Sequence, residues 1–109
     1  MWICSVDGFF SIVQIPAREA WAVRARDRRH LAAALPGHNV IETPKADYPF
    51  RAIVGRGELD SLMQHFAAGI DYPNFKNRVD EGGGWYSRAL HEVWEVLWSR
   101  AFGVRPRDE

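Results

Sequence analysis

The sequence has little cysteine and no long apolar run. Its single cysteine, Cys4, excludes an intramolecular disulfide, which agrees with a reducing compartment. No apolar run approaches the roughly 18 residues that a membrane helix needs. The first residues are strand-like and lack the basic and apolar regions of a secretory signal. We therefore expect a cytoplasmic protein without a membrane segment.

The sequence also lacks a net charge. Fourteen Lys or Arg residues balance fourteen Asp or Glu residues. The distribution is uneven, because residues 1–57 hold eight cations against five anions, and residues 58–109 hold six against nine. A chain without a global positive field does not attract nucleic acid over long range, and no motif of a known nucleic-acid-binding fold is present. Nucleic acid is therefore not expected as a partner, and a nucleic-acid-contacting protein remains the last of three alternatives.

The 109 residues suffice for one core, and 47% of them are apolar. We expect a single domain over residues 1–103, followed by a frayed tail over residues 104–109. Apolar alternation predicts five strands, and 3.6-residue periodicity predicts helices. The strands are expected at Met1–Ser5, Phe9–Ile15, Glu19–Arg26, Val40–Thr43 and Phe50–Val54. The helices are expected from the N-cap Asp27 through Leu35, from beyond Gly55-Arg56-Gly57 to Ile70, and over Trp85–Phe102.

This order predicts an α+β fold, with a mostly antiparallel five-stranded sheet and helices on one face. The β-α-β-β-α segment Trp21–Ile70 has the pattern of a ferredoxin-like half. Residues 77–84 are polar and end in three glycines, which predicts a loop or hinge rather than a helix.

Two similar segments contain Asp-Tyr-Pro, an aromatic residue and a cation. They are Ala46–Arg51 and Ile70–Lys76. If they meet in space, two phenols and two cations would border one cleft suited to a small polar or anionic ligand. The simpler interpretation is that each Asp caps a turn while each Tyr buries its ring. The candidate ligand-binding residues, including two strand arginines, are Arg24, Arg26, Asp47, Tyr48, Arg51, Asp71, Tyr72 and Lys76.

Arg24 and Arg26 share one strand face and could contact phosphate together with Arg51. The alternative is a solvated face on which these arginines pair with carboxylates such as those of Glu42 and Asp47. No histidine has metal-ligand spacing to another His or Cys, so no metal and no cofactor are expected. Cys4 is expected to be a buried structural thiol. No nucleophile motif is present, and catalytic residues remain unassigned.

Several motifs resemble a family of small uncharacterised bacterial and phage proteins of about this length. The resemblance covers most of residues 1–78 and implies a compact bacterial cytoplasmic protein, without an activity or site residues to carry over. The motifs are Gly8–Gln14 (GFFSIVQ), Val23–Arg26 (VRAR), Val40–Pro44 (VIETP), Ala46–Arg51 (ADYPFR) and Ile70–Lys76 (IDYPNFK).

The helix Trp85–Phe102 is apolar around more of its circumference than packing on one sheet requires. We expect it to pack against a second copy and form a dimer. A monomer with a thick aromatic core is the alternative. The favoured function is a non-enzymatic binding module that self-associates, and a small enzyme at the Asp-Tyr-Pro segments is the second.

Overall fold

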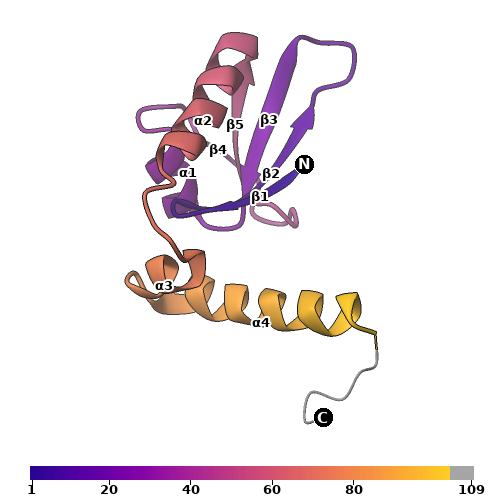
Figure 1. Cartoon of the computed structure of the whole chain (residues 1–109). Helices are drawn as coiled ribbons and strands as arrows, with labels where there is room; N and C mark the ends of the chain where they lie inside the picture. The colour runs from indigo at the N-terminus through magenta and orange to yellow at the C-terminus, as the bar shows by residue number, and fades with distance from the viewer. Residues whose placement is uncertain (104–109) are drawn as a thin grey trace. The chain divides into compact units, whose positions relative to one another are not determined.

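The computed structural model describes residues 1–103, which form five strands and four helices (Figure 1). The chain divides into two compact units, Met1–Asp71 and Tyr72–Glu109. The single domain stays a prediction, and the predicted tail at 104–109 lies outside the described residues. The elements are β1 (Trp2–Ser5), β2 (Gly8–Gln14), β3 (Ala20–Ala25), α1 (Arg28–Ala34), β4 (Ile41–Glu42), β5 (Phe50–Gly55), α2 (Arg56–Ala68), α3 (Phe75–Asp80) and α4 (Gly84–Ala101).

The first unit is built on an antiparallel sheet with the strand order β1-β2-β3-β5-β4, which confirms the predicted α+β class. Strands β3 and β4 both pair antiparallel with β5 and therefore run parallel to each other on its two sides. Helix α1 connects them, which is the split β-α-β arrangement of a ferredoxin-like half. The N-terminal strand β2 occupies the free side of β3.

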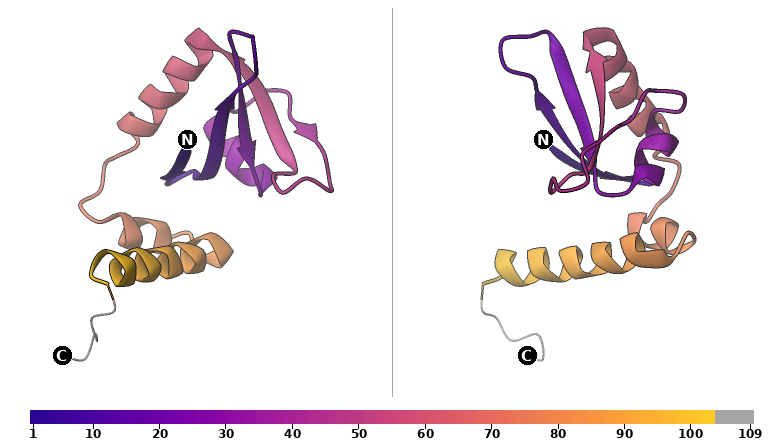
Figure 2. Two further views of the ribbon diagram at one scale, coloured as in Figure 1. Left: turned by 90° about the vertical axis from the view of Figure 1, so that its right-hand side faces the viewer. Right: turned by 180° about the vertical axis from the view of Figure 1, so that it is seen from behind.

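Helices α1 and α2 lie beside each other over one face of this sheet (Figures 1 and 2). Alternation along β3 directs Trp21, Val23 and Ala25 toward the helices, as its pattern predicts. Val23 and Ala25 have no exposed surface. The core is completed by Phe10, Ile12, Ala52 and Val54 from the other strands and by Leu31, Ala34, Leu35, Leu59, Leu62 and Phe66 from the helices. Burying each large side chain stabilises the fold by about 1.5–3 kcal/mol.

The two helices begin at capping contacts. The carboxylate of Asp27 accepts a hydrogen bond from the Arg29 amide at 2.9 Å, which confirms Asp27 as the N-cap of α1. At α2 the Gly55 amide donates to Glu58 Oε1 at 3.0 Å. Because of this contact, Arg56 and Gly57 form the first turn of α2 rather than a loop before it. The same hydrogen bond, with a second from His38, lowers the pKa of Glu58.

The second unit contains a short helix, α3, where the sequence predicts a loop over residues 77–84. The prediction is wrong for residues 77–80, because Asn74 caps the helix by accepting from the Asn77 amide at 3.0 Å, and Val79 is buried. It is confirmed for residues 81–83, which lie between the two helices. Asp80 then accepts from the Ser87 hydroxyl and contacts His91 Nε2 at 2.9 Å, both on α4. Ser87 first, and then His91, lower the pKa of Asp80.

The glycines of this segment make a turn between α3 and α4. Gly83 and Gly84 have φ values of 61° and 79°, a conformation that L side chains rarely adopt. Helix α4 then spans Gly84–Ala101, close to its predicted range. Among the described residues, no helix combines the length and the hydrophobicity that crossing a membrane requires.

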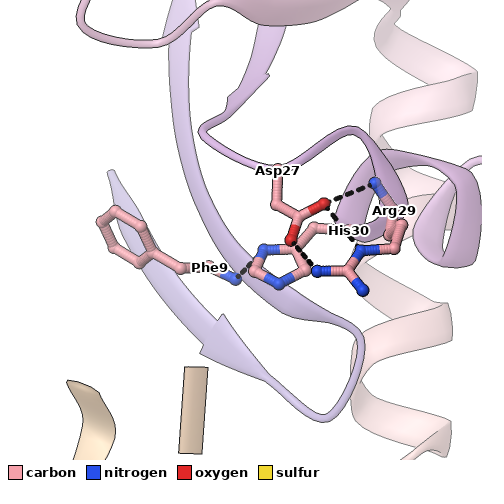
Figure 3. A network of polar contacts seen from close by, with 4 residues as sticks. All are labelled: Phe9, Asp27, Arg29 and His30. Atoms are coloured by element: carbon pink, nitrogen blue, oxygen red, sulfur yellow. Dashed lines mark hydrogen bonds and ion pairs between the residues drawn. The ribbon is translucent and has the colours of Figure 1, made fainter. Parts of the chain in front are cut away.

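The turn between β1 and β2 is fixed by a buried histidine on α1 (Figure 3). The Phe9 amide donates to His30 Nδ1 at 3.2 Å, so that nitrogen must be unprotonated. Burial lowers the pKa of His30 and outweighs the opposing effect of Asp27. Gly8 packs directly against the ring, with a φ of 150°. A Cβ atom at Gly8 would lie 2.1 Å from His30 Cγ.

We therefore predict that Gly8→Ala destabilises the first unit. The added methyl group must displace the His30 ring, and the backbone conformation is unfavourable for alanine. Both effects together should lower the free energy of unfolding by at least about 2 kcal/mol in a denaturant titration. Gly57→Ala is the matched control, because nothing lies within 4 Å of its added Cβ. It should stabilise α2 by about 0.5–1 kcal/mol. Equal stability of the two variants would contradict this role of Gly8.

The pKa of His30 predicts a pH dependence of stability. The folded pKa is lowered, so the stabilisation is fully present above the ordinary value of 6.5. It is lost as the pH falls from there through the folded pKa, because only the unfolded chain takes up the proton. The loss is at most about 1.4 kcal/mol per pH unit. His30→Asn keeps a hydrogen-bond acceptor but cannot titrate, so its stability should change less between pH 7.5 and 5.5 in chemical denaturation. Identical pH profiles of stability for the wild-type protein and His30→Asn would refute this role of His30.

Candidate functional site

Three polar side chains lie side by side on the face of the sheet opposite α1 and α2, which we call the second face. The strand register pairs Ser11 on β2 with Arg24 on β3, and Arg24 with Arg51 on β5. Residues paired across neighbouring strands project to the same side of a sheet. Two guanidinium groups thus occupy adjacent strands with a hydroxyl next to them.

Tyr48, in the connection between β4 and β5, is buried with 5% of its surface exposed. The guanidinium carbons of Arg24 and Arg26 each lie 4.7 Å from the centroid of its ring. Each contact is a cation–π interaction, stronger where water is excluded. Phe9 lies against the same ring, with the centroids 6.4 Å apart. The Tyr48 ring therefore holds the orientation of two cations.

Hydrogen bonds fix the same arginines further. Arg24 Nη2 donates to Ser11 Oγ at 2.6 Å. Arg26 Nε donates to the main-chain oxygen of Asp47 at 3.1 Å. The Asp47 carboxylate accepts from the Tyr48 amide at 3.1 Å. In this segment Asp47 therefore holds the turn and Tyr48 buries its ring, as the simpler interpretation of the motif proposed.

The guanidinium groups of Arg24, Arg26 and Arg51 form no ion pair within residues 1–103. The expected pairing of the strand arginines with Glu42 is wrong, because Glu42 contacts Arg28 on α1 at 3.1 Å. The Nε atoms of Arg24 and Arg51 are enclosed without a hydrogen-bond partner. Like charges on paired residues destabilise a sheet, and an unsatisfied buried donor adds to this. An anion at this position would relieve the repulsion.

The second Asp-Tyr-Pro segment lies at the boundary of the two units. Asp71 closes the first unit, and Tyr72 and Lys76 belong to the second. Within the second unit the Tyr72 ring contacts Phe75 with the centroids 5.8 Å apart. Lys76 Nζ lies 3.9 Å from the centroid of the Trp94 ring. A cleft shared by Tyr48 and Tyr72 stays a prediction.

Cys4 is exposed, so the expectation of a buried structural thiol is wrong. The pairing of Ile3 with Phe10 directs Ile3 to the core, and Cys4, paired with Phe9, projects to the second face. Partial burial raises the pKa of the Cys4 thiol, which keeps it protonated at neutral pH. A protonated thiol is a poor nucleophile.

A hollow of about 550 Å³ lies between α1 and α2. Its histidines already have partners, since His38 Nε2 contacts Glu58 at 2.9 Å and His65 Nε2 contacts Asp7 at 2.6 Å. Among the described residues, no three His, Cys, Asp or Glu side chains gather closely enough to hold a metal ion. The second face, with its unpaired cations, is therefore the stronger candidate.

The sequence pointed to the three arginines and to Tyr48 but missed Ser11 and Trp2. Trp2 pairs with Ser11, so it extends the same row of side chains, and 75% of its surface is exposed. The alternation of each strand could be read from the sequence, whereas the register between strands could not.

Comparisons with models of known protein families, with curated proteins and with solved structures find no match for this chain. The resemblance to small bacterial and phage proteins therefore stays a prediction.

Proposed function

We propose that the protein is a small binding module that holds an anionic group on the second face, at Arg24, Arg26 and Arg51. The observation that supports this most is the cluster of three guanidinium groups without a carboxylate partner. Arginine binds carboxylate and phosphate through two parallel hydrogen bonds. Only the Nε atom of Arg51 is enclosed, which leaves its terminal nitrogens open to a ligand.

The arrangement suits binding better than catalysis. Tyr48 and Asp47 are the groups that acid–base chemistry would use. The Tyr48 ring lies against two cations, and the Asp47 carboxylate already accepts the Tyr48 amide. Arginine stays protonated at neutral pH, so it cannot act as a base. These groups can orient a ligand, and none is placed as a free general base. We therefore favour the binding module over the small enzyme.

Replacing Arg51 by glutamine should weaken anion binding without harming the fold. A charge-assisted hydrogen bond contributes about 1.5–3 kcal/mol, so the affinity for inorganic phosphate or pyrophosphate should fall about tenfold or more. Stability should stay constant or rise, because the repulsion from Arg24 is removed. Calorimetry of binding and denaturant unfolding measure the two effects. Arg18→Gln, in the exposed β2–β3 loop, is the control and should leave both unchanged. If neither anion binds, or if both variants bind equally, the proposal fails.

A second proposal concerns helix α4, on which we propose that two copies associate. Val93, Val96 and Leu97 are exposed by 46%, 56% and 63%. Val96 and Leu97 lie three and four residues after Val93, so all three share one side of the helix. Leu90, three residues before Val93, is buried at the border of this side, and the neighbouring side carries Ser87 and His91, which contact Asp80. An apolar stripe next to an already packed one suits a two-fold dimer.

Leu97→Glu should therefore shift the protein toward monomer. A charge in an apolar contact lacks a partner, so the dissociation constant should rise at least tenfold in sedimentation equilibrium at micromolar concentration. Arg88→Glu, at another exposed position of α4, should leave the mass unchanged. A monomeric mass of the wild-type protein would refute association through α4.

A further inference from the structure

The second face carries aromatic side chains beside its cations. Trp2 pairs with Ser11, Ser11 with Arg24 and Arg24 with Arg51, which places one row of side chains across β1, β2, β3 and β5. The Trp2 ring packs edge-to-face on Phe9, with the centroids 6.2 Å apart. Phe9 in turn contacts Tyr48. An exposed flat ring therefore stands at one end of the row and two guanidinium groups at the other.

We infer that the anion on this face is the phosphate of a nucleotide, whose base stacks on Trp2. The inference rests on the proposed anion site and adds the chemical class of its ligand. Neighbouring strands are about 4.8 Å apart, so the backbone at Trp2 is separated by about 10 Å from that at Arg24 and by about 14 Å from that at Arg51. The side chains can close part of this gap, which suits a ligand with a planar end and a phosphate end. Stacking on aromatic rings beside arginines is the usual way in which proteins hold unpaired bases.

Each part of the row has a distinct task. Trp2 offers a face that every base can stack on, because stacking needs only a π-surface. Arg51 has terminal nitrogens without a protein partner, and it contacts the phosphate. Arg24 is held by Ser11 and Tyr48, so its guanidinium is oriented before the ligand arrives. An oriented group loses less conformational entropy on binding.

The same chemistry is found in a free nucleotide and in a single strand of RNA or DNA. A duplex is not the ligand, because its bases are stacked inside and cannot reach Trp2. The chain has no net charge, so long-range attraction is weak and contacts at the site must supply the affinity. At most three phosphates are contacted. A plot of the logarithm of the binding constant against the logarithm of the salt concentration should therefore fall with a slope of about 2 or less.

The test uses the full chain and four probes, with binding measured by calorimetry. The probes are adenosine monophosphate, ribose 5-phosphate, adenosine, and an eight-nucleotide single strand of RNA. Adenosine monophosphate should bind about tenfold more tightly than ribose 5-phosphate, because only the former can stack. A single strand that binds more tightly than the mononucleotide identifies the strand as the ligand, whereas equal affinity per site identifies the free nucleotide. Either result supports the inference.

Variants separate the two ends of the site. Trp2→Ala should lower the affinity for adenosine monophosphate about tenfold and leave the affinity for ribose 5-phosphate unchanged. Arg51→Gln should lower the affinity for both compounds. Because 75% of the surface of Trp2 is exposed, its replacement should leave the fold intact, and denaturant unfolding checks this. Trp85→Ala, a tryptophan of the second unit with 39% exposure, is the matched control and should change neither.

Failure of this inference differs from failure of the anion site. If adenosine monophosphate and ribose 5-phosphate bind equally and Trp2→Ala has no effect, the nucleotide inference is refuted while the anion site stands. If neither compound binds, the nucleotide inference and the anion site are both refuted. If Trp2→Ala destabilises the fold, Trp2→Phe replaces it, and its ring should retain more of the affinity for adenosine monophosphate than Trp2→Leu.

Discussion

The contact between the Tyr48 ring and two guanidinium groups determines how the second face is built. Tyr48 is buried in the connection before β5, and Arg24 and Arg26 each lie 4.7 Å from its centroid. Without this ring, two long cations at the end of β3 would spread into solvent, as arginine side chains usually do. Because the ring holds them, their charge is concentrated next to Arg51 on the neighbouring strand. The site is therefore a product of one loop residue packing under the side chains of a strand.

The position of the loop depends in turn on the core on the other face. Strands β3 and β5 pair over six residues, and their inward side chains, among them Val23 and Val54, are enclosed by α1 and α2. At the other edge, His30 on α1 accepts the Phe9 amide and so fixes the start of β2. Phe9 is also the residue that joins Trp2 to Tyr48. A buried neutral histidine on one face thus positions the aromatic row on the other face.

Local patterns predicted most of the first unit, because they act through neighbouring residues. The Asp27 cap and the alternation of β3 each depend on a few adjacent positions. Helix α3 was missed because its stability comes from the Asn74 cap and from contacts of Asp80 with α4, and polar residues with three glycines obscure both. The face of Cys4 and the adjacency of Arg24 and Arg51 depend on strand register, which pairs residues far apart in the sequence. The candidate residues were therefore readable one by one, whereas their arrangement was not.

The charge of the whole chain and the charge of its site lead to different expectations, and the structure explains why. Equal numbers of cations and anions argue against any ligand attracted over long range. Three anions of the first unit nevertheless have local partners: Asp27 contacts Arg29, Glu42 contacts Arg28, and Glu58 contacts His38. These carboxylates pair with cations on or beside α1, and none of them pairs with Arg24 or Arg51. Leaving Arg24 and Arg51 adjacent and unpaired costs stability, and proteins usually accept such a cost where a ligand supplies the missing charge. A balanced total charge is therefore compatible with a strongly cationic site, provided that the site binds by contact and not by attraction at a distance.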